Sequence, residues 1–173
     1  MRLIGHGSRV GAMDSFDPLV TTRTANPDEY GRVIELSKNM RHEKVAGIES
    51  DLWESDPIAW IGDECKKGNA EVAVAFDSAT QNIVASGIGI IYEDPSSSYD
   101  ELNEKIGYIR WMSTAVDFRG YGVGEQILNH LMNWFEENDA SRVQLHATDK
   151  ATEFYSQHGF QKDTETDMWW RKA

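Results

Sequence analysis

Apolar residues recur three and four positions apart in several stretches of the chain, which is the pattern of amphipathic helices. The clearest stretch has an apolar stripe formed by Ile127, Leu128, Leu131, Trp134 and Phe135. Its opposite face carries only polar residues, namely Glu125, Asn129, Asn133, Glu136 and Glu137. This arrangement predicts a helix with one buried face and one solvated face.

Three further helices are predicted from start and stop signals. Residues 26–40 begin with an Asn-Pro pair and a Glu three positions after the Asn, the pattern of a capping box. Residues 56–69 begin with an Asp-Pro pair and end in Gly-Asn, and residues 150–158 are followed by a glycine. Each of these segments is therefore expected to be a short helix with defined ends.

Runs rich in β-branched and aromatic residues separate these helices and predict strands. They occupy residues 19–22, 71–76, 83–92, 106–116, 142–147 and 166–170. Because strands and helices alternate in one continuous series, the pattern predicts an α/β or α+β fold with a mixed sheet.

The composition fits one globular domain. The 173 residues are 40% hydrophobic and 27% charged, which is close to the average for globular proteins. The first sixteen residues contain several glycines and no apolar run. We therefore expect residues 1–16 to be a flexible N-terminal extension and residues 17–173 to form a single domain.

The net charge of the chain limits the classes of partner that it is expected to bind. Lys and Arg number 17 against 29 Asp and Glu, which gives a formal net charge of −12 and a pI of about 4.8. Such a protein repels nucleic acid and anionic membranes at long range, and it attracts small cations. The single cysteine, Cys65, excludes an intrachain disulfide. No signal peptide or membrane-spanning run is recognisable, so a cytoplasmic protein is expected.

A glycine-rich turn joins the long strand to the clearest helix, and its residues are Arg119, Gly120, Tyr121, Gly122, Val123 and Gly124. Glycines at a helix start let the backbone approach a ligand and present free N–H groups. Phosphate is the ligand that such groups typically bind. The alternative is an ordinary strand-to-helix turn without a ligand. The two common nucleotide motifs fail, because Glu125 replaces the third glycine of a dinucleotide fingerprint and no Gly-Lys-Ser/Thr triplet exists.

The spacing Arg-x-x-Gly-x-Gly at residues 119–124 resembles the pyrophosphate loop of the GNAT superfamily of N-acetyltransferases. Residues 145–160 resemble the second signature of that family, a strand followed by a helix bearing Phe-Tyr and then Gly-Phe. The resemblance covers about residues 19–170 and is strongest over residues 106–160. It implies a GNAT-like, mostly antiparallel sheet of about seven strands flanked by about four helices.

The resemblance also implies a cofactor, acetyl-coenzyme A. Its pyrophosphate would lie on the six loop residues named above, and its pantetheine arm along the backbone of Met112, Ser113 and Thr114. The alternative for these three residues is ordinary pairing within the sheet. Thr148 stands where the family often has Asn, and Val116 stands where it often has Pro. No metal site is implied.

Tyr155 is the catalytic candidate that the resemblance supplies, as a hydrogen-bond donor to the leaving thiolate. The alternative is an aromatic side chain that only packs in the core. The general base stays open, since residues 107–111 contain no Glu. His146 has a suitable reference pKa, but a structural role is the alternative. Trp53 and Trp60 fall in the segment that lines the acceptor pocket of the family.

The expected acceptor is a small-molecule or peptide amine. Glu49, Asp51, Glu54 and Asp56 would suit a cationic one, although a solvated acidic surface explains them equally well. The leading interpretation is an acetyl-coenzyme A-dependent N-acetyltransferase, and a homodimer is compatible with it. The alternatives are a noncatalytic acyl-coenzyme A sensor and a nucleotide-binding α/β domain.

Overall fold

The computed structural model describes residues 19–44, 56–94 and 104–163. In these residues the strands are β1 (Val20–Thr24), β2 (Ala70–Asp77), β3 (Ile83–Asp94), β4 (Glu104–Thr114) and β5 (Arg142–Leu145). The helices are α1 (Tyr30–Lys44), α2 (Pro57–Lys67), α3 (Val123–Glu137) and α4 (Asp149–Gln157). Short 3-10 turns occupy Pro27–Glu29, ahead of α1, and Val116–Phe118, ahead of α3.

The five described strands form one sheet in the order β1-β2-β3-β4-β5. The pairs β1–β2, β2–β3 and β3–β4 are antiparallel, and only β4–β5 is parallel. The expected mixed α/β class with a mostly antiparallel sheet is therefore confirmed, with five described strands instead of about seven. The strand expected at 166–170 and the extension expected at 1–16 lie outside the described residues.

Two strand ends differ from the sequence prediction. The strand expected at 106–116 ends at Thr114, because the next residues close a tight turn in which Phe118 N donates to Ala115 O at 2.9 Å. The strand expected at 142–147 ends at Leu145, where the chain leaves the sheet towards α4. Past the end of β4 the apolar residues Ala115 and Val116 continue the pattern, and the exposed Val116 shows that this apolar character does not reflect burial in the sheet.

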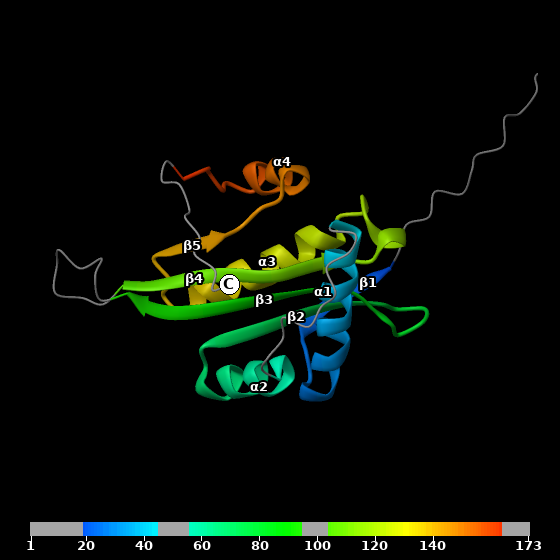
Figure 1. The fold of residues 1–173 in the computed structure, drawn as a ribbon, viewed down its shortest axis with the longest axis horizontal. Helices are drawn as coiled ribbons and strands as arrows, with labels where there is room; N and C mark the ends of the chain where they lie inside the picture. The colour runs from blue at the N-terminus through cyan, green and yellow to red at the C-terminus, as the bar shows by residue number, and fades with distance from the viewer. Residues whose placement is uncertain (1–18, 45–55, 95–103, 164–173) are drawn as a thin grey trace, which may run out of the picture.

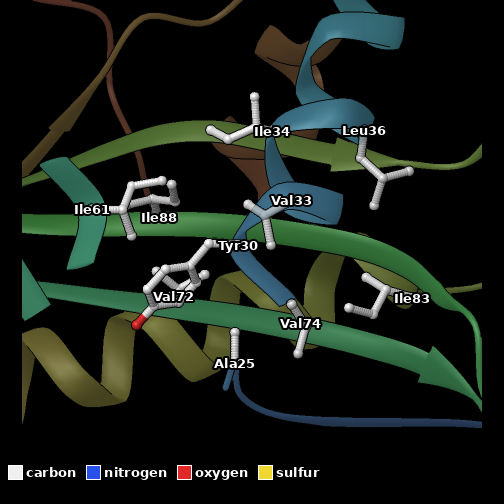
Figure 2. Close-up of a cluster of buried hydrophobic side chains, with 10 residues drawn as sticks. All are labelled: Ala25, Tyr30, Val33, Ile34, Leu36, Ile61, Val72, Val74, Ile83 and Ile88. Carbon is white, nitrogen blue, oxygen red and sulfur yellow. The ribbon is translucent and has the colours of Figure 1, made fainter. Parts of the chain in front are cut away.

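Helices α1 and α2 cover one face of the sheet and α3 covers the other (Figure 1). Helix α2 begins where the sequence signals predicted, whereas the signals at residues 26–29 begin a 3-10 turn that continues into α1 at Tyr30. Asn26 N donates to the Glu29 carboxylate at 2.7 Å, and the Asp56 carboxylate accepts from Ile58 N at 3.0 Å. The cluster between these helices and the sheet is drawn in Figure 2 and consists of Ala25, Tyr30, Val33, Ile34, Leu36, Ile61, Val72, Val74, Ile83 and Ile88.

Glycines in β3 and β4 let α3 approach the opposite face closely. A Cβ added to Gly107 or to Gly89 would lie 2.7 or 2.9 Å from the ring of Phe135, which is far inside van der Waals contact. A Cβ added to Gly87 would lie 2.8 Å from Ile127 Cγ2. Helix α3, which begins at the glycine-rich turn, is therefore seated directly on the backbone of the sheet.

Replacing Leu131 by alanine should destabilise the fold by about 2–5 kcal/mol, because the side chain is fully buried against the sheet and its removal leaves a cavity. Chemical denaturation with an unchanged m-value measures this loss. Asn129→Ala, on the exposed face of the same helix, is the matched control and should change stability by less than about 0.5 kcal/mol. Equal losses in both variants would contradict the assignment of the buried face.

Candidate active site

The turn between β4 and α3 has the backbone geometry of an anion site. Gly120 and Gly122 have φ values of +83° and +73°, a region that other residues rarely adopt. An added Cβ at either position would meet no protein atom within 4 Å, so the space beside the turn is open. The first bond of this helix start runs from Gln126 N to Gly122 O at 3.1 Å. The amides of residues 123–125 precede it and are therefore available to an anion at the positive end of the helix dipole.

Side chains of the turn tie it to the end of β4. Arg119 Nε donates to Thr114 O at 2.8 Å. A Cβ added to Gly124 would lie 3.5 Å from Thr114 Oγ1, which is ordinary contact. The Val123 side chain is buried, so it can offer a ligand only its backbone amide, whereas Tyr121 is exposed. The turn and the last residues of β4 thus form one continuous surface.

That end of β4 continues past its pairing with β5. The β4–β5 pairing runs from Ile106 opposite Arg142 to Ile109 opposite Leu145, and β5 ends there. On its other side β4 stays paired with β3 as far as Thr114. In the described residues, the ladder between β4 and β5 therefore ends at Ile109, ahead of residues 110–114. Met112, Ser113 and Thr114, the three residues expected to lie along a pantetheine arm, belong to this part of β4.

This part of β4 begins with a bulge. The β3–β4 register shifts between Ser86 and Ile88, and Trp111 on β4 has a φ of +54°. Both the Ser37 and the Ser113 hydroxyls approach the Trp111 carbonyl oxygen, each at 3.4 Å. A bulge redirects the backbone and breaks the regular alternation of side chains. This feature of Trp111 could not be read from the sequence, since the residue type gives no signal for a positive φ.

Tyr155 on α4 reaches the same part of β4 from the α3 side of the sheet. Its hydroxyl donates to the sulfur of Met112 at 3.5 Å, and its ring meets the Phe160 ring at 5.7 Å. Burial raises the pKa of Tyr155 to about 12, so the phenol keeps its proton at neutral pH. A thioether is a weak acceptor, which leaves this hydroxyl ready to exchange it for a stronger one.

The raised pKa of Tyr155 predicts a loss of stability in alkali. An unfolded tyrosine ionises near pH 10, whereas the folded one resists until about pH 12. The unfolded state therefore releases its proton first, and stability should fall as the pH rises through this interval. Denaturant unfolding at pH 8 and at several values above 10 tests this. The wild type should lose more stability than Tyr155→Phe, and parallel losses would show that Tyr155 does not contribute.

A pocket of about 750 Å³ lies beside β5 and α4 and is lined by both Tyr155 and His146. The Tyr108 hydroxyl forms a hydrogen bond with His146 Nδ1, so the ring is held at the end of β5. Thr148 occupies the N-cap position of α4, where Ala151 N donates to its carbonyl oxygen at 2.8 Å. Its hydroxyl makes no capping hydrogen bond, so the cap that a Thr side chain could supply there is not formed.

The structure thus brings Tyr155 to Met112, and it brings α4 to the turn, since a Cβ added to Gly124 would lie 4.0 Å from Phe154 Cζ. Thr148 stands at the start of the same helix α4. Trp60 lies on α2, against the other face of the sheet. Trp53 and the acidic residues 49, 51 and 54 lie outside the described residues. Asp56 caps α2 and is accounted for by that role. The partners of His146 and Trp111, namely Tyr108 and Arg110, were not singled out from the sequence.

In residues 19–44, 56–94 and 104–163, no helix has both the length and the apolar content needed to cross a bilayer. The same three stretches hold no group of three or more His, Cys, Asp or Glu side chains that is placed to bind a metal ion.

Several solved structures share this fold. A predicted acetyltransferase from Clostridium acetobutylicum, solved with acetyl-CoA, matches with a TM-score of 0.73 at 20% identity, over 90% of this chain and 96% of that one. A GCN5-related N-acetyltransferase from Ralstonia eutropha matches with 0.72 at 21% identity, over 86% and 97%. Glucosamine-6-phosphate N-acetyltransferase from Arabidopsis thaliana matches with 0.68 at 17% identity, over 89% and 99%.

These structures show which fold the chain has, and comparison of its sequence with family models shows which family it belongs to. No curated protein sequence matches the chain. A model of the acetyltransferase (GNAT) domain matches residues 68–162, which is more than half of the 173 residues and includes the glycine-rich turn and Tyr155. The resemblance found in the two sequence signatures is confirmed by this match. The chain belongs to the GNAT family of acetyltransferases.

Proposed function

We propose that this protein is an acetyl-coenzyme A-dependent N-acetyltransferase that acts on a primary amine of a small molecule or peptide. The observation that carries this proposal is the meeting of three features at one end of the sheet. These are the anion-binding turn, the β4 edge past Ile109 and the Tyr155 hydroxyl beside the sulfur of Met112.

The turn and the β4 edge fit the two ends of the cofactor. The amides of residues 123–125, together with the open space beside Gly120 and Gly122, would hold the pyrophosphate. The backbone of Met112, Ser113 and Thr114, which lies past the last β4 residue paired with β5, would hold the pantetheine arm and donate a hydrogen bond to the carbonyl. When bound, acetyl-coenzyme A supplies the thioester whose acetyl group the amine receives.

Tyr155 would stabilise the thiolate that leaves. Complete proton transfer from a phenol of pKa about 12 to an alkyl thiolate of pKa about 8.5 is uphill. A hydrogen bond from the neutral phenol needs no such transfer, and it strengthens as negative charge develops on the sulfur. The half-buried position of Tyr155 and its raised pKa therefore suit a donor better than a full acid.

The amine must lose a proton during the reaction. Among the described residues that line the 750 Å³ pocket, His146 is the one whose reference pKa lies near neutrality. The hydrogen bond between the Tyr108 hydroxyl and His146 Nδ1 holds the imidazole ring at the end of β5. We therefore assign His146 as the proton acceptor, with Tyr108 as a positioning residue.

Thiol release from acetyl-coenzyme A, followed with a panel of amines, tests the proposed activity. Turnover with at least one amine, together with thermal stabilisation by coenzyme A, is expected. Stabilisation by coenzyme A without turnover of any amine would instead support a noncatalytic sensor, which the absence of Glu from residues 107–111 favours. Stabilisation by NAD or ATP and not by coenzyme A would overturn both.

A further inference from the structure

The side of β4 that faces α2 carries an arginine that lies over two neighbouring tryptophan rings. Arg110 Cζ lies 5.3 Å from the ring centre of Trp111 and 5.8 Å from that of Trp60. The two indoles meet edge to face, with ring centres 6.1 Å apart and an interplanar angle of 69°. Both are partly buried against the core beneath α1 and α2, so they form a fixed support for the guanidinium.

Arg110 is exposed although it is stacked in this way. In the described ranges 19–44, 56–94 and 104–163, no carboxylate forms an ion pair with it. A guanidinium presents its N–H donors as a planar fork, which suits an oxyanion such as a carboxylate or a phosphate.

The position of Arg110 relates it to the reaction. Ile109 is the last β4 residue paired with β5, so Arg110 is the first residue of the β4 edge past that pairing. The turn that would bind pyrophosphate and the Tyr155 hydroxyl approach this edge from the α3 side. An amine that approaches the edge from the opposite, α2 side would meet Arg110, Trp60 and Trp111.

We propose that Arg110, supported by Trp60 and Trp111, binds an oxyanion of the acceptor, a carboxylate or a phosphate carried by the same molecule as the reacting amine. This inference rests on the proposed function and adds the class of its substrate. A bidentate contact would orient the acceptor so that its amine points to the β4 edge. The net charge of −12 does not repel a zwitterion, and a contact at Arg110 acts within the screening length of about 8 Å.

Two matched pairs of compounds test this inference: β-alanine with β-alaninamide, and phosphoethanolamine with ethanolamine. Their binding to the protein, with and without coenzyme A, is measured by calorimetry, and thiol release is followed in parallel. At least one anionic member should bind about ten- to a hundredfold more tightly than its neutral partner. The pair that shows the difference identifies the oxyanion as carboxylate or phosphate.

Variants locate the effect. Arg110→Gln should abolish the preference for the anion, and Arg110→Lys should retain part of it, since the charge remains while the planar fork is lost. Arg32→Gln removes an exposed arginine that pairs with Glu35 on α1 at 2.8 Å, and it should behave as the wild type. All three variants should bind coenzyme A with unchanged affinity, which also shows that they are folded.

Failure of this inference can be distinguished from failure of the proposed function. If neither anion binds the wild type better than its neutral partner, or if Arg110→Gln keeps the preference, the oxyanion site is wrong while coenzyme A binding stands. If the wild type does not bind coenzyme A, the proposed activity is wrong, and the measurements on the free protein still decide the role of Arg110.

Discussion

Gly122→Val is expected to reduce coenzyme A affinity by more than about a hundredfold, because two or more hydrogen bonds from backbone amides to a charged phosphate would be lost. Gly122 has a φ of +73° and precedes the first turn of α3, with open space where a Cβ would lie. A branched side chain there would occupy this space and force the backbone out of the left-handed region. Calorimetry with coenzyme A measures the loss.

Gly68→Val is the matched control for this experiment. Gly68 ends α2 with a φ of +78°, and an added Cβ there also meets no atom within 4 Å. The two substitutions should therefore cause a similar backbone strain and a similar loss of stability. Only Gly122→Val should lose coenzyme A. If Gly122→Val kept the wild-type affinity, or if both variants lost it equally, the assignment of the turn to pyrophosphate would be wrong.

Tyr155→Phe is expected to lower turnover at saturating substrates by about ten- to a thousandfold, with coenzyme A affinity nearly unchanged. The substitution removes only the hydroxyl, whose contact in the structure is the weak one to Met112 at 3.5 Å. The substitution is expected to lower turnover and not coenzyme A affinity, because the hydrogen bond strengthens only as charge develops on the sulfur. Single-turnover kinetics with a good acceptor measure the chemical step separately from product release.

Tyr30→Phe provides the comparison for Tyr155. Tyr30 is buried in the cluster beneath α1, and burial also raises its pKa, with a contribution from the Cys65 side chain. It lies outside the candidate site, so its loss should leave turnover unchanged whatever it does to stability. Full activity in Tyr155→Phe would remove that residue from the mechanism. Equal losses in both variants would indicate a general effect of deleting a buried hydroxyl.

The fold was predictable to the extent that burial and local signals agree in the sequence. The stripe of α3, the Asp-Pro start of α2 and the Asn-Pro start ahead of α1 all lie where the sequence predicted them. The ends of β4 and β5 were predicted less well. Apolar residues such as Val116 continue beyond the last paired residue, and only the hydrogen bonds of the following turn end the strand.

The sequence indicated which residues are candidates for the site, but it did not indicate which of their side chains contact one another. Two sequence signatures identified the turn and Tyr155, because glycines and the Phe-Tyr pair leave a local pattern. The bulge at Trp111, the stacking of Arg110 and the contact between Tyr108 and His146 depend on strand register. Register sets which side chains share a face, and residue type alone does not encode it.

The seating of α3 on Gly87, Gly89 and Gly107 has a consequence for the kinetics of cofactor capture. A helix pressed against bare backbone has little freedom to tilt or slide, and its first turn carries the amides that would receive the pyrophosphate. The binding site for the cofactor would then be preorganised, and association would cost little conformational entropy of the chain. Coenzyme A should accordingly associate in a single kinetic phase whose rate rises linearly with its concentration, without the plateau that a slow rearrangement of the protein imposes.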